Sequence, residues 1–113
     1  IVQENTDIRD FISTFKFDII TVDVSFISLL NIITHINRLA LDDIILLFKP
    51  QFEVGINAKR TKNGVVKDEK AINKAMVNLE AQCSALGWKL IKKSTSKIKG
   101  KEGNIELFYY FKK

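Results

Sequence analysis

Residues 43–55 read DIILLFKPQFEVG, and this stretch is the strongest indication of the fold class. Residues 43–48 form one continuous, mainly apolar run, which is typical of a strand buried on both faces of a sheet. Lys49-Pro50 ends that strand, because proline has no backbone N–H to donate to a sheet. Residues 51–66 contain Gly55 and Gly64 among several polar residues, so we expect a loop there.

Upstream of this stretch, the sequence predicts one more strand and one or two helices. A β-branched run at 18–24 predicts another buried strand, and residues 7–16 read as a short helix or turn. Residues 28–40 carry apolar side chains at helical spacing and predict an amphipathic helix with Ser25 or Ser28 as its cap. The apolar positions of that helix are Leu29, Ile32, Ile33, Ile36 and Leu39.

Downstream, residues 68–86 predict a long helix that Asp68 caps and Gly87 ends. Its apolar stripe consists of Ile72, Ala75, Met76, Leu79 and Cys83. Residues 88–95 and 104–112 predict two further strands. Alternating strands and helices require the first three strands to be parallel with right-handed crossovers, and the short last connection makes the final strand antiparallel to the third. We therefore expect an α/β sheet with helices on its faces.

Length and charge limit the classes of function. The chain has 113 residues, 46% of them hydrophobic and 27% charged, which suits one globular domain. The net charge of +5 is uneven: residues 1–56 carry −4 and residues 57–113 carry +9. Such asymmetry indicates either a polyanionic partner for the second half or a solvated lysine face, and charge alone favours neither. The apolar stretch 24–36 is too short and too polar to span a bilayer.

The single cysteine, Cys83, excludes an internal disulfide and fits a reducing compartment. Its place in the stripe of the long helix predicts a buried, unreactive thiol.

Three ionisable residues that lie far apart in the sequence meet at one edge of the predicted sheet. Asp23 and Lys49 each lie at the carboxyl end of a parallel strand, and Glu106 lies near the start of the antiparallel one. Ligands of open α/β sheets bind outside the carboxyl ends of the parallel strands. The residues alone leave two interpretations open, an ordinary Asp–Lys ion pair or a functional site.

Three stretches resemble the TlyA (hemolysin A) family of FtsJ-like RNA 2′-O-methyltransferases. They are DVSFISL at 23–29, KPQFEVG at 49–55 and GNIE at 103–106, in the order and strand placement that the family shows. The resemblance runs from about Glu4 to Phe111. It implies the carboxyl-terminal part of a class I S-adenosylmethionine-dependent methyltransferase sheet. On this interpretation residues 1–113 are a partial FtsJ-like domain, without the amino-terminal cofactor-binding half and the S4-type RNA-binding domain.

The resemblance also assigns catalytic and cofactor-binding residues. Asp23, Lys49 and Glu106 match the second, third and fourth members of the family's Lys-Asp-Lys-Glu tetrad, and the first Lys has no counterpart. Asp7 would contact the adenine of S-adenosylmethionine, or cap a helix, and Asp23 would also lie near the cofactor. The family's Gly-rich turn is absent, so we expect this chain alone not to methylate RNA.

In the chemistry that the resemblance implies, Lys49 is the base that deprotonates a ribose hydroxyl, Asp23 orients it, and Glu106 positions Lys49 or the ribose. No metal is required, and no metal-ligand spacing is present.

Several lysines are candidates for RNA contact. Lys97, Lys99 and Lys101 flank the Glu106 rim and favour phosphate contact over a solvated loop. The group Lys59, Arg60 and Lys62 has the same two interpretations. Glu53 serves either as a structural hydrogen-bonding group or as an RNA or cofactor contact.

The family function is cytoplasmic 2′-O-methylation of cytidine in ribosomal RNA or a ribosomal subunit. The alternatives are a non-catalytic RNA-binding module and, least favoured, a membrane-active hemolysin. We also expect the strand at 18–24 to present an exposed apolar edge that can pair with a second copy.

Overall fold

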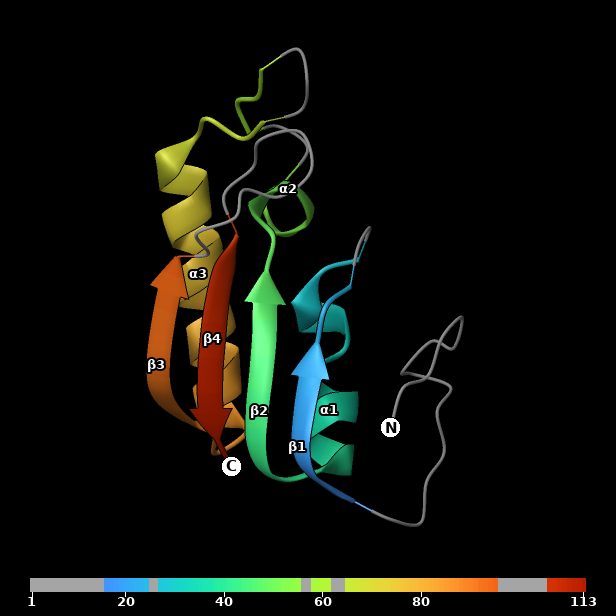
Figure 1. Cartoon of the computed structure of the whole chain (residues 1–113). Helices are drawn as coiled ribbons and strands as arrows, with labels where there is room; N and C mark the ends of the chain where they lie inside the picture. The colour runs from blue at the N-terminus through green and yellow to red at the C-terminus, as the bar shows by residue number, and fades with distance from the viewer. Residues whose placement is uncertain (1–15, 25–26, 56–57, 62–64, 96–105) are drawn as a thin grey trace.

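A computed structural model of the chain describes residues 16–24, 27–55, 58–61, 65–95 and 106–113. Its centre is a four-stranded sheet in the order β1-β2-β4-β3 (Figure 1). The strands are β1 (Phe17–Val22), β2 (Ala40–Phe48), β3 (Lys89–Thr95) and β4 (Leu107–Lys112). Each predicted strand is therefore present, although β2 begins three residues earlier than the apolar run suggested.

The directions of the strands follow the predicted topology. β1 pairs with β2 in parallel, with Val22 opposite Leu46. β4 is antiparallel to both of its neighbours, β2 and β3, so β1, β2 and β3 all point the same way. The α/β class and the antiparallel last strand are confirmed. The insertion of β4 between β2 and β3 was not part of the prediction.

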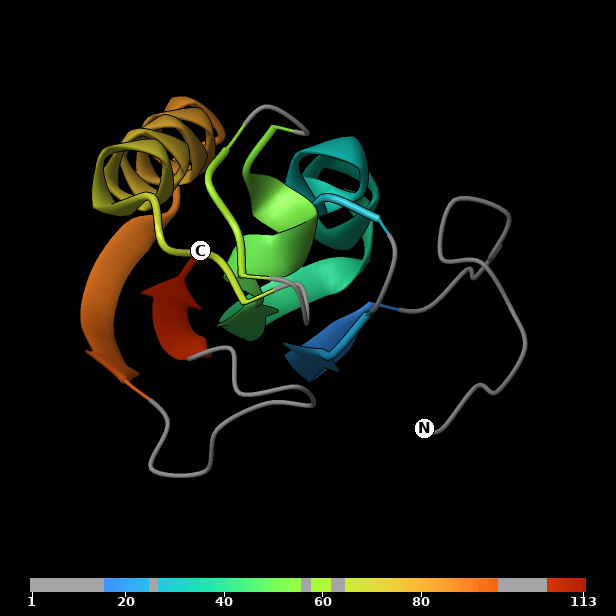
Figure 2. The ribbon, with the colours of Figure 1, turned by 90° about the horizontal axis from the view of Figure 1, so that it is seen from above.

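The described helices all lie on one face of the sheet, as the view from above shows (Figure 2). They are the 3-10 helix η1 (Leu29–Asn31), α1 (Ile33–Leu39), α2 (Pro50–Glu53) and α3 (Glu69–Ala85). The predicted helix over 28–40 divides at Ile32, where the backbone leaves helical geometry (φ −122°, ψ −13°). Ser28 caps η1, because its Oγ accepts a hydrogen bond from the Leu30 N–H at 3.1 Å.

Three residues of the 49–88 region explain where its helices begin and end. The loop prediction for 51–66 was wrong at its start, because Pro50 occupies the first turn of α2, where its missing N–H costs nothing. Asp68 caps α3 through the Ala71 N–H at 3.1 Å, as predicted. Gly87 follows α3 with φ +87°, a conformation that favours glycine and turns the chain into β3. Residues 7–15 of the helix or turn predicted at 7–16 lie outside the described residues.

The core lies between the sheet and its helices. Its fully buried members come from alternate positions of β2 and β4 and from η1, α1 and α3; the largest are Leu29, Ile32, Ile36, Ile44, Leu46, Phe48, Leu79, Cys83, Tyr109 and Phe111. Burial of such side chains stabilises the fold by about 1.5–3 kcal/mol each. Leu79 and Cys83 confirm the predicted stripe of α3.

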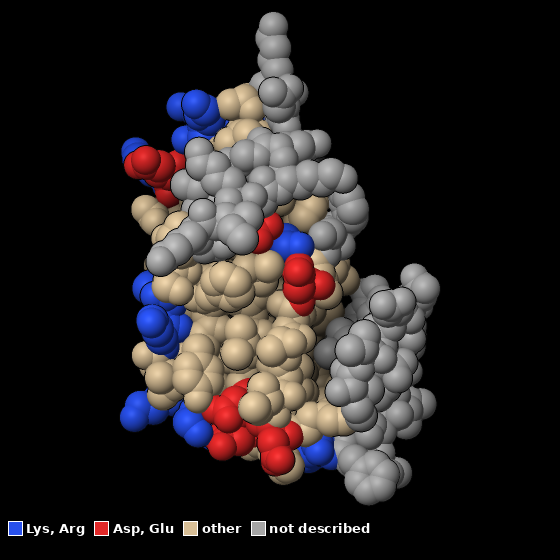
Figure 3. Space-filling view, in the orientation of Figure 1, with Lys and Arg blue, Asp and Glu red and all other residues tan. Residues whose placement is uncertain are grey.

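The face of the sheet that these helices leave bare carries exposed apolar side chains. The prediction that 18–24 is a buried strand was wrong: in β1 only Val22 is buried, and Ile19 is 60% exposed. Phe108 on β4 is also exposed. Figure 3 shows a largely uncharged central face, with charged side chains gathered along one edge and at the two ends of the strands. An apolar β-strand sequence thus did not reveal that one side of the strand lacks a covering layer among the described residues.

Candidate functional site

An ion pair joins the ends of the two parallel strands. Asp23 follows β1 and Lys49 follows β2, so parallel pairing brings them to the same edge of the sheet. The Lys49 Nζ lies 2.5 Å from the Asp23 Oδ1. The Lys49 side chain is only 12% exposed, whereas that of Asp23 is 68% exposed. In this pair the lysine side chain is therefore largely enclosed by the protein, whereas its carboxylate partner faces solvent.

Glu106 lies at the same edge, which we call the rim. The register pairs Phe48 with Leu107, so Glu106 and Lys49 are each one residue beyond that pair. Glu106 is half-buried. The structure thus gathers Asp23, Lys49 and Glu106 where the sequence placed them, while their roles stay predictions.

Glu53 makes structural hydrogen bonds. Its Oε2 accepts from the Ser28 hydroxyl at 2.6 Å, and its Oε1 accepts from the Leu29 N–H at 2.8 Å. Burial raises the pKa of the Glu53 carboxyl, and the hydrogen bonds from Ser28 and Leu29 act in the opposite direction. Between the two alternatives, the structure therefore favours the hydrogen-bonding role. Sequence reasoning missed the partnership with Ser28, although each residue lies in one of the two motifs that flank the rim.

Two of the basic candidates for RNA contact, Lys59 and Arg60, lie within the described residues. Arg60 donates from its guanidinium to the carbonyls of Gln51, Gly55 and Ala58 at 3.2–3.3 Å, so it holds the chain after α2. Lys59 is exposed.

The remaining lysines of these predictions, Lys62, Lys97, Lys99 and Lys101, lie outside the described residues, as does Asp7. The segment with the last three lysines nevertheless joins Thr95 to Glu106, and Thr95 pairs with Leu107 at the rim end of β4.

The ionisable side chains of α3 that face the sheet, Cys83 and Glu80, have structural roles. Cys83 is fully buried, and burial together with the nearby Glu80 charge raises the pKa of its thiol to about 12. Glu80 accepts hydrogen bonds from the Tyr109 hydroxyl at 2.8 Å and from the Lys93 ammonium at 3.2 Å. This cluster ties α3 to β3 and β4.

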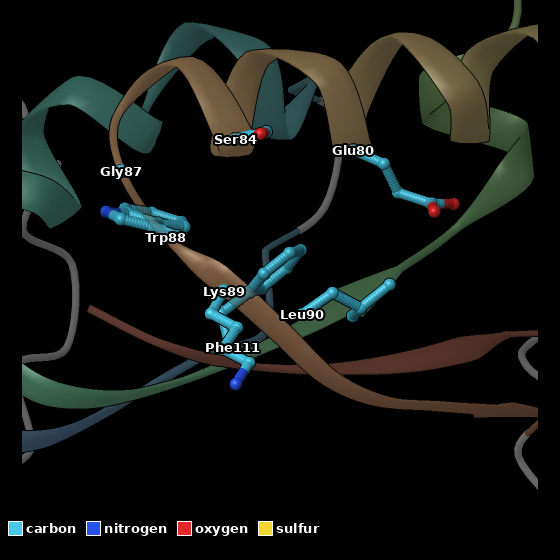
Figure 4. A pocket seen from close by; sticks show the side chains of 7 residues that line it. All are labelled: Glu80, Ser84, Gly87, Trp88, Lys89, Leu90 and Phe111. Atoms are coloured by element: carbon cyan, nitrogen blue, oxygen red, sulfur yellow. The ribbon is translucent and has the colours of Figure 1, made fainter.

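A hollow lies between α3 and the start of β3 (Figure 4). Trp88 and Phe111 line it with ring centroids 5.7 Å apart, and the Trp88 indole N–H is already donated to Asn37 at 2.8 Å. Its remaining lining residues are Glu80, Ser84, Gly87, Lys89 and Leu90. Trp88 and Phe111 belong to the core, and the Glu80 carboxylate already accepts hydrogen bonds from Tyr109 and Lys93.

The sequence matches a known protein family. The family model described as FtsJ-like methyltransferase matches residues 2–113. The chain belongs to the FtsJ-like methyltransferase family. The TlyA-type resemblance of the motifs is confirmed by a relative from Campylobacter jejuni, named 23S rRNA (cytidine-2′-O)-methyltransferase TlyA, which is 60% identical over 111 residues. That match covers 98% of this chain and 44% of the relative.

Two less similar proteins also match most of this chain. The 16S/23S rRNA (cytidine-2′-O)-methyltransferase TlyA of Mycobacterium tuberculosis is 31% identical over 99 residues, which cover 86% of this chain and 37% of the relative. The crystal structure of a candidate hemolysin from Lactococcus lactis superimposes with a TM-score of 0.79 at 28% identity, over 96% of this chain and 51% of that one. The chain therefore spans about half the length of the relatives it matches, or less. No helix among the described residues is long and apolar enough to cross a membrane.

Proposed function

We propose that this chain carries the catalytic rim of a methyltransferase that modifies the 2′-hydroxyl of cytidine in ribosomal RNA. The observation that carries the proposal is the Asp23–Lys49 pair, which lies at the carboxyl ends of two parallel strands in an FtsJ-like chain. The names of the two TlyA relatives supply the substrate class. The proposed setting is the cytoplasm, with ribosomal RNA or a ribosomal subunit as the partner.

Lys49 is the proposed base. A ribose hydroxyl becomes a good nucleophile only as it loses its proton, and the uncharged Lys49 amine would accept that proton. The adjacent Asp23 carboxylate would then hold the resulting ammonium in place. Because the Lys49 stem is buried, its nitrogen has a restricted set of positions, which favours alignment with the incoming hydroxyl. Glu106, beside Lys49 in the register, would hydrogen-bond the ribose or Lys49.

The described residues supply only part of a site for S-adenosylmethionine. S-adenosylmethionine would supply the methyl group when bound. Asp23, exposed at the rim, has carboxylate surface free to face such a group, whereas Asp7 lies outside the described residues. The sequence holds no Gly-rich turn of the kind that the family uses for the cofactor. We therefore assign cofactor contact to Asp23 and Asp7 and expect most of the cofactor site to come from residues beyond these 113.

Phosphate contact would come from Lys97, Lys99 and Lys101. The two residues that flank their segment, Thr95 and Glu106, lie at the rim end of the sheet. Lysines there would hold an RNA backbone across Lys49 without reading its sequence.

The test uses a form of the protein that spans the full length of its relatives. That form is incubated with unmodified ribosomal subunits and radiolabelled S-adenosylmethionine, and the RNA is digested to nucleosides. We expect the label in 2′-O-methylcytidine. Label on a base would contradict the proposal, and RNA retention without any label would favour the non-catalytic RNA-binding module. Leakage of liposomes in place of RNA methylation would favour the hemolysin.

A further inference from the structure

Two noncovalent contacts, an ion pair and a hydrogen bond, join residues 23–28 to residues 49–53. The Asp23–Lys49 ion pair connects the end of β1 to the residue before α2, and the Ser28–Glu53 hydrogen bond connects the cap of η1 to the last residue of α2. Lys49 and Glu53 are thus at opposite ends of a single helical turn. The Phe52 N–H to Lys49 carbonyl bond, at 2.9 Å, and the Val54 N–H to Pro50 carbonyl bond, at 3.0 Å, make that turn rigid.

The hydrogen bonds of Glu53 have a defined direction. Ser28 Oγ accepts from the Leu30 N–H at 3.1 Å, so its own proton is available for Glu53. The second oxygen of Glu53 accepts from the Leu29 N–H. An ionised carboxylate satisfies both donors at once, and charge-assisted hydrogen bonds of this kind are stronger than neutral ones. Glu53 therefore fixes where α2 lies relative to η1.

We infer that Glu53 is a positioning residue, which sets the place of Lys49 at the rim by clamping α2 to the Ser28 end of η1. The inference rests on the proposed function for its effect on catalysis. Its structural part, the control of the Asp23–Lys49 pair by Glu53, can be measured without any activity. Because a displacement of about 1 Å at a reacting group costs about a hundredfold in rate, loss of the clamp should slow methyl transfer.

Glu80 provides a matched control. It is also a partly buried glutamate whose carboxylate accepts from two residues, but its donors are the side chains of Tyr109 and Lys93, and it lies on α3 away from the rim. Replacing Glu80 removes a comparable set of bonds, so it measures the effect of lost stability alone.

The first experiment follows the Lys49 ammonium by NMR in the 113-residue chain, with a Lys49→Arg variant to assign its signal. In the wild-type chain the ion pair should give this ammonium a shift distinct from those of exposed lysines. Glu53→Ala should move the signal to the position of the exposed lysines, Glu53→Gln should retain part of the difference, and Glu80→Ala should leave it unchanged. If Glu53→Ala does not fold, as judged by its amide spectrum, Glu53→Gln and Ser28→Ala give the answer.

The second experiment measures kcat and KM for methyl transfer in the full-length form. We expect Glu53→Ala to lower kcat by about ten- to a hundredfold with KM for RNA little changed, Glu53→Gln to recover part of the loss, and Glu80→Ala to keep wild-type kcat. A Lys49 signal and a kcat that both survive Glu53→Ala would overturn the inference, as would equal losses in the Glu80 variant. If the wild type makes no 2′-O-methyl product while the NMR shift still depends on Glu53, the proposed function fails and the positioning role stands.

Discussion

At the scale of single residues, the exposure of Asp23 limits how much its ion pair with Lys49 can stabilise the fold. An ion pair with one partner in solvent contributes only about 0–1 kcal/mol to stability, because water screens the charge of that partner. Asp23 is 68% exposed, so stability is a weak reason for the pair. The sequence could predict this meeting, since each residue directly follows an apolar strand run. It could not predict the Ser28–Glu53 bond, because nothing in the spacing of 28 and 53 shows how η1 lies against α2.

Cys83 gives a prediction at the same scale. Burial and the Glu80 charge raise the pKa of its thiol from 9.0 to about 12, which lowers the thiolate fraction of the folded chain at pH 8 about a thousandfold. We expect a thiol reagent to label the folded chain at pH 8 far more slowly than the chain unfolded in urea, as followed by mass spectrometry. Equal labelling rates in the two states would contradict the assignment.

The same shift sets a pH dependence of stability. The folded-state pKa lies above the unfolded one, so the protonated thiol favours the folded state fully below pH 9, and this contribution is lost between pH 9 and 12. Cys83→Ala should remove that part of the decline in the free energy of unfolding, although it also costs some packing.

At the scale of elements, some features were readable in the sequence and others were not. The apolar run of β2, the Asp68 cap of α3 and the turn at Gly87 follow from local chemistry and are present as predicted. The exposure of β1 was not readable, because a β-branched run has the same sequence whether or not another layer covers it. The short helix α2 was missed because a single turn is too short to show helical periodicity.

The edge of the described sheet at β1 leads to a further prediction. β1 is one of the two edge strands of the described sheet, and Ile19 on it is 60% exposed. Apolar edge strands pair readily with other strands, and a charge on the edge opposes this. We expect the 113-residue chain to self-associate in sedimentation experiments and Ile19→Lys to shift it toward monomer.

The matched control is Val77→Lys, at an apolar position on α3 that is 68% exposed. It should leave self-association unchanged. A strictly monomeric wild-type chain, or an equal effect of the Val77 variant, would contradict edge pairing.

At the scale of the whole molecule, the described helices cover one face of the sheet (Figures 1 and 2). The rim lies at the end of the sheet where β1 and β2 end. The fold class and the rim were predictable, because strand direction alone brings Asp23, Lys49 and Glu106 together. The insertion of β4 between β2 and β3 was not predictable. A short connection makes β4 antiparallel to β3, but it does not decide on which side of β3 the strand lies.

This arrangement predicts that the 113-residue chain alone transfers no methyl group to RNA. It holds the rim but neither the Gly-rich turn nor the first lysine that the family resemblance requires. The measurement compares the chain with a full-length form on the same ribosomal subunits. Activity of the chain comparable to that of the full-length form would contradict the prediction, since the chain has Lys49 but lacks that turn and that first lysine.

The most direct test of the account is methyl transfer by a Lys49→Ala variant of the full-length form, with Lys93→Ala as the matched loss of an ion-paired lysine. S-adenosylmethionine binding is measured by calorimetry in the same samples. We expect Lys49→Ala to abolish transfer to ribosomal RNA and to leave cofactor binding measurable, while Lys93→Ala remains active. Undiminished transfer by the Lys49 variant would remove Lys49 from the role of base and contradict the account.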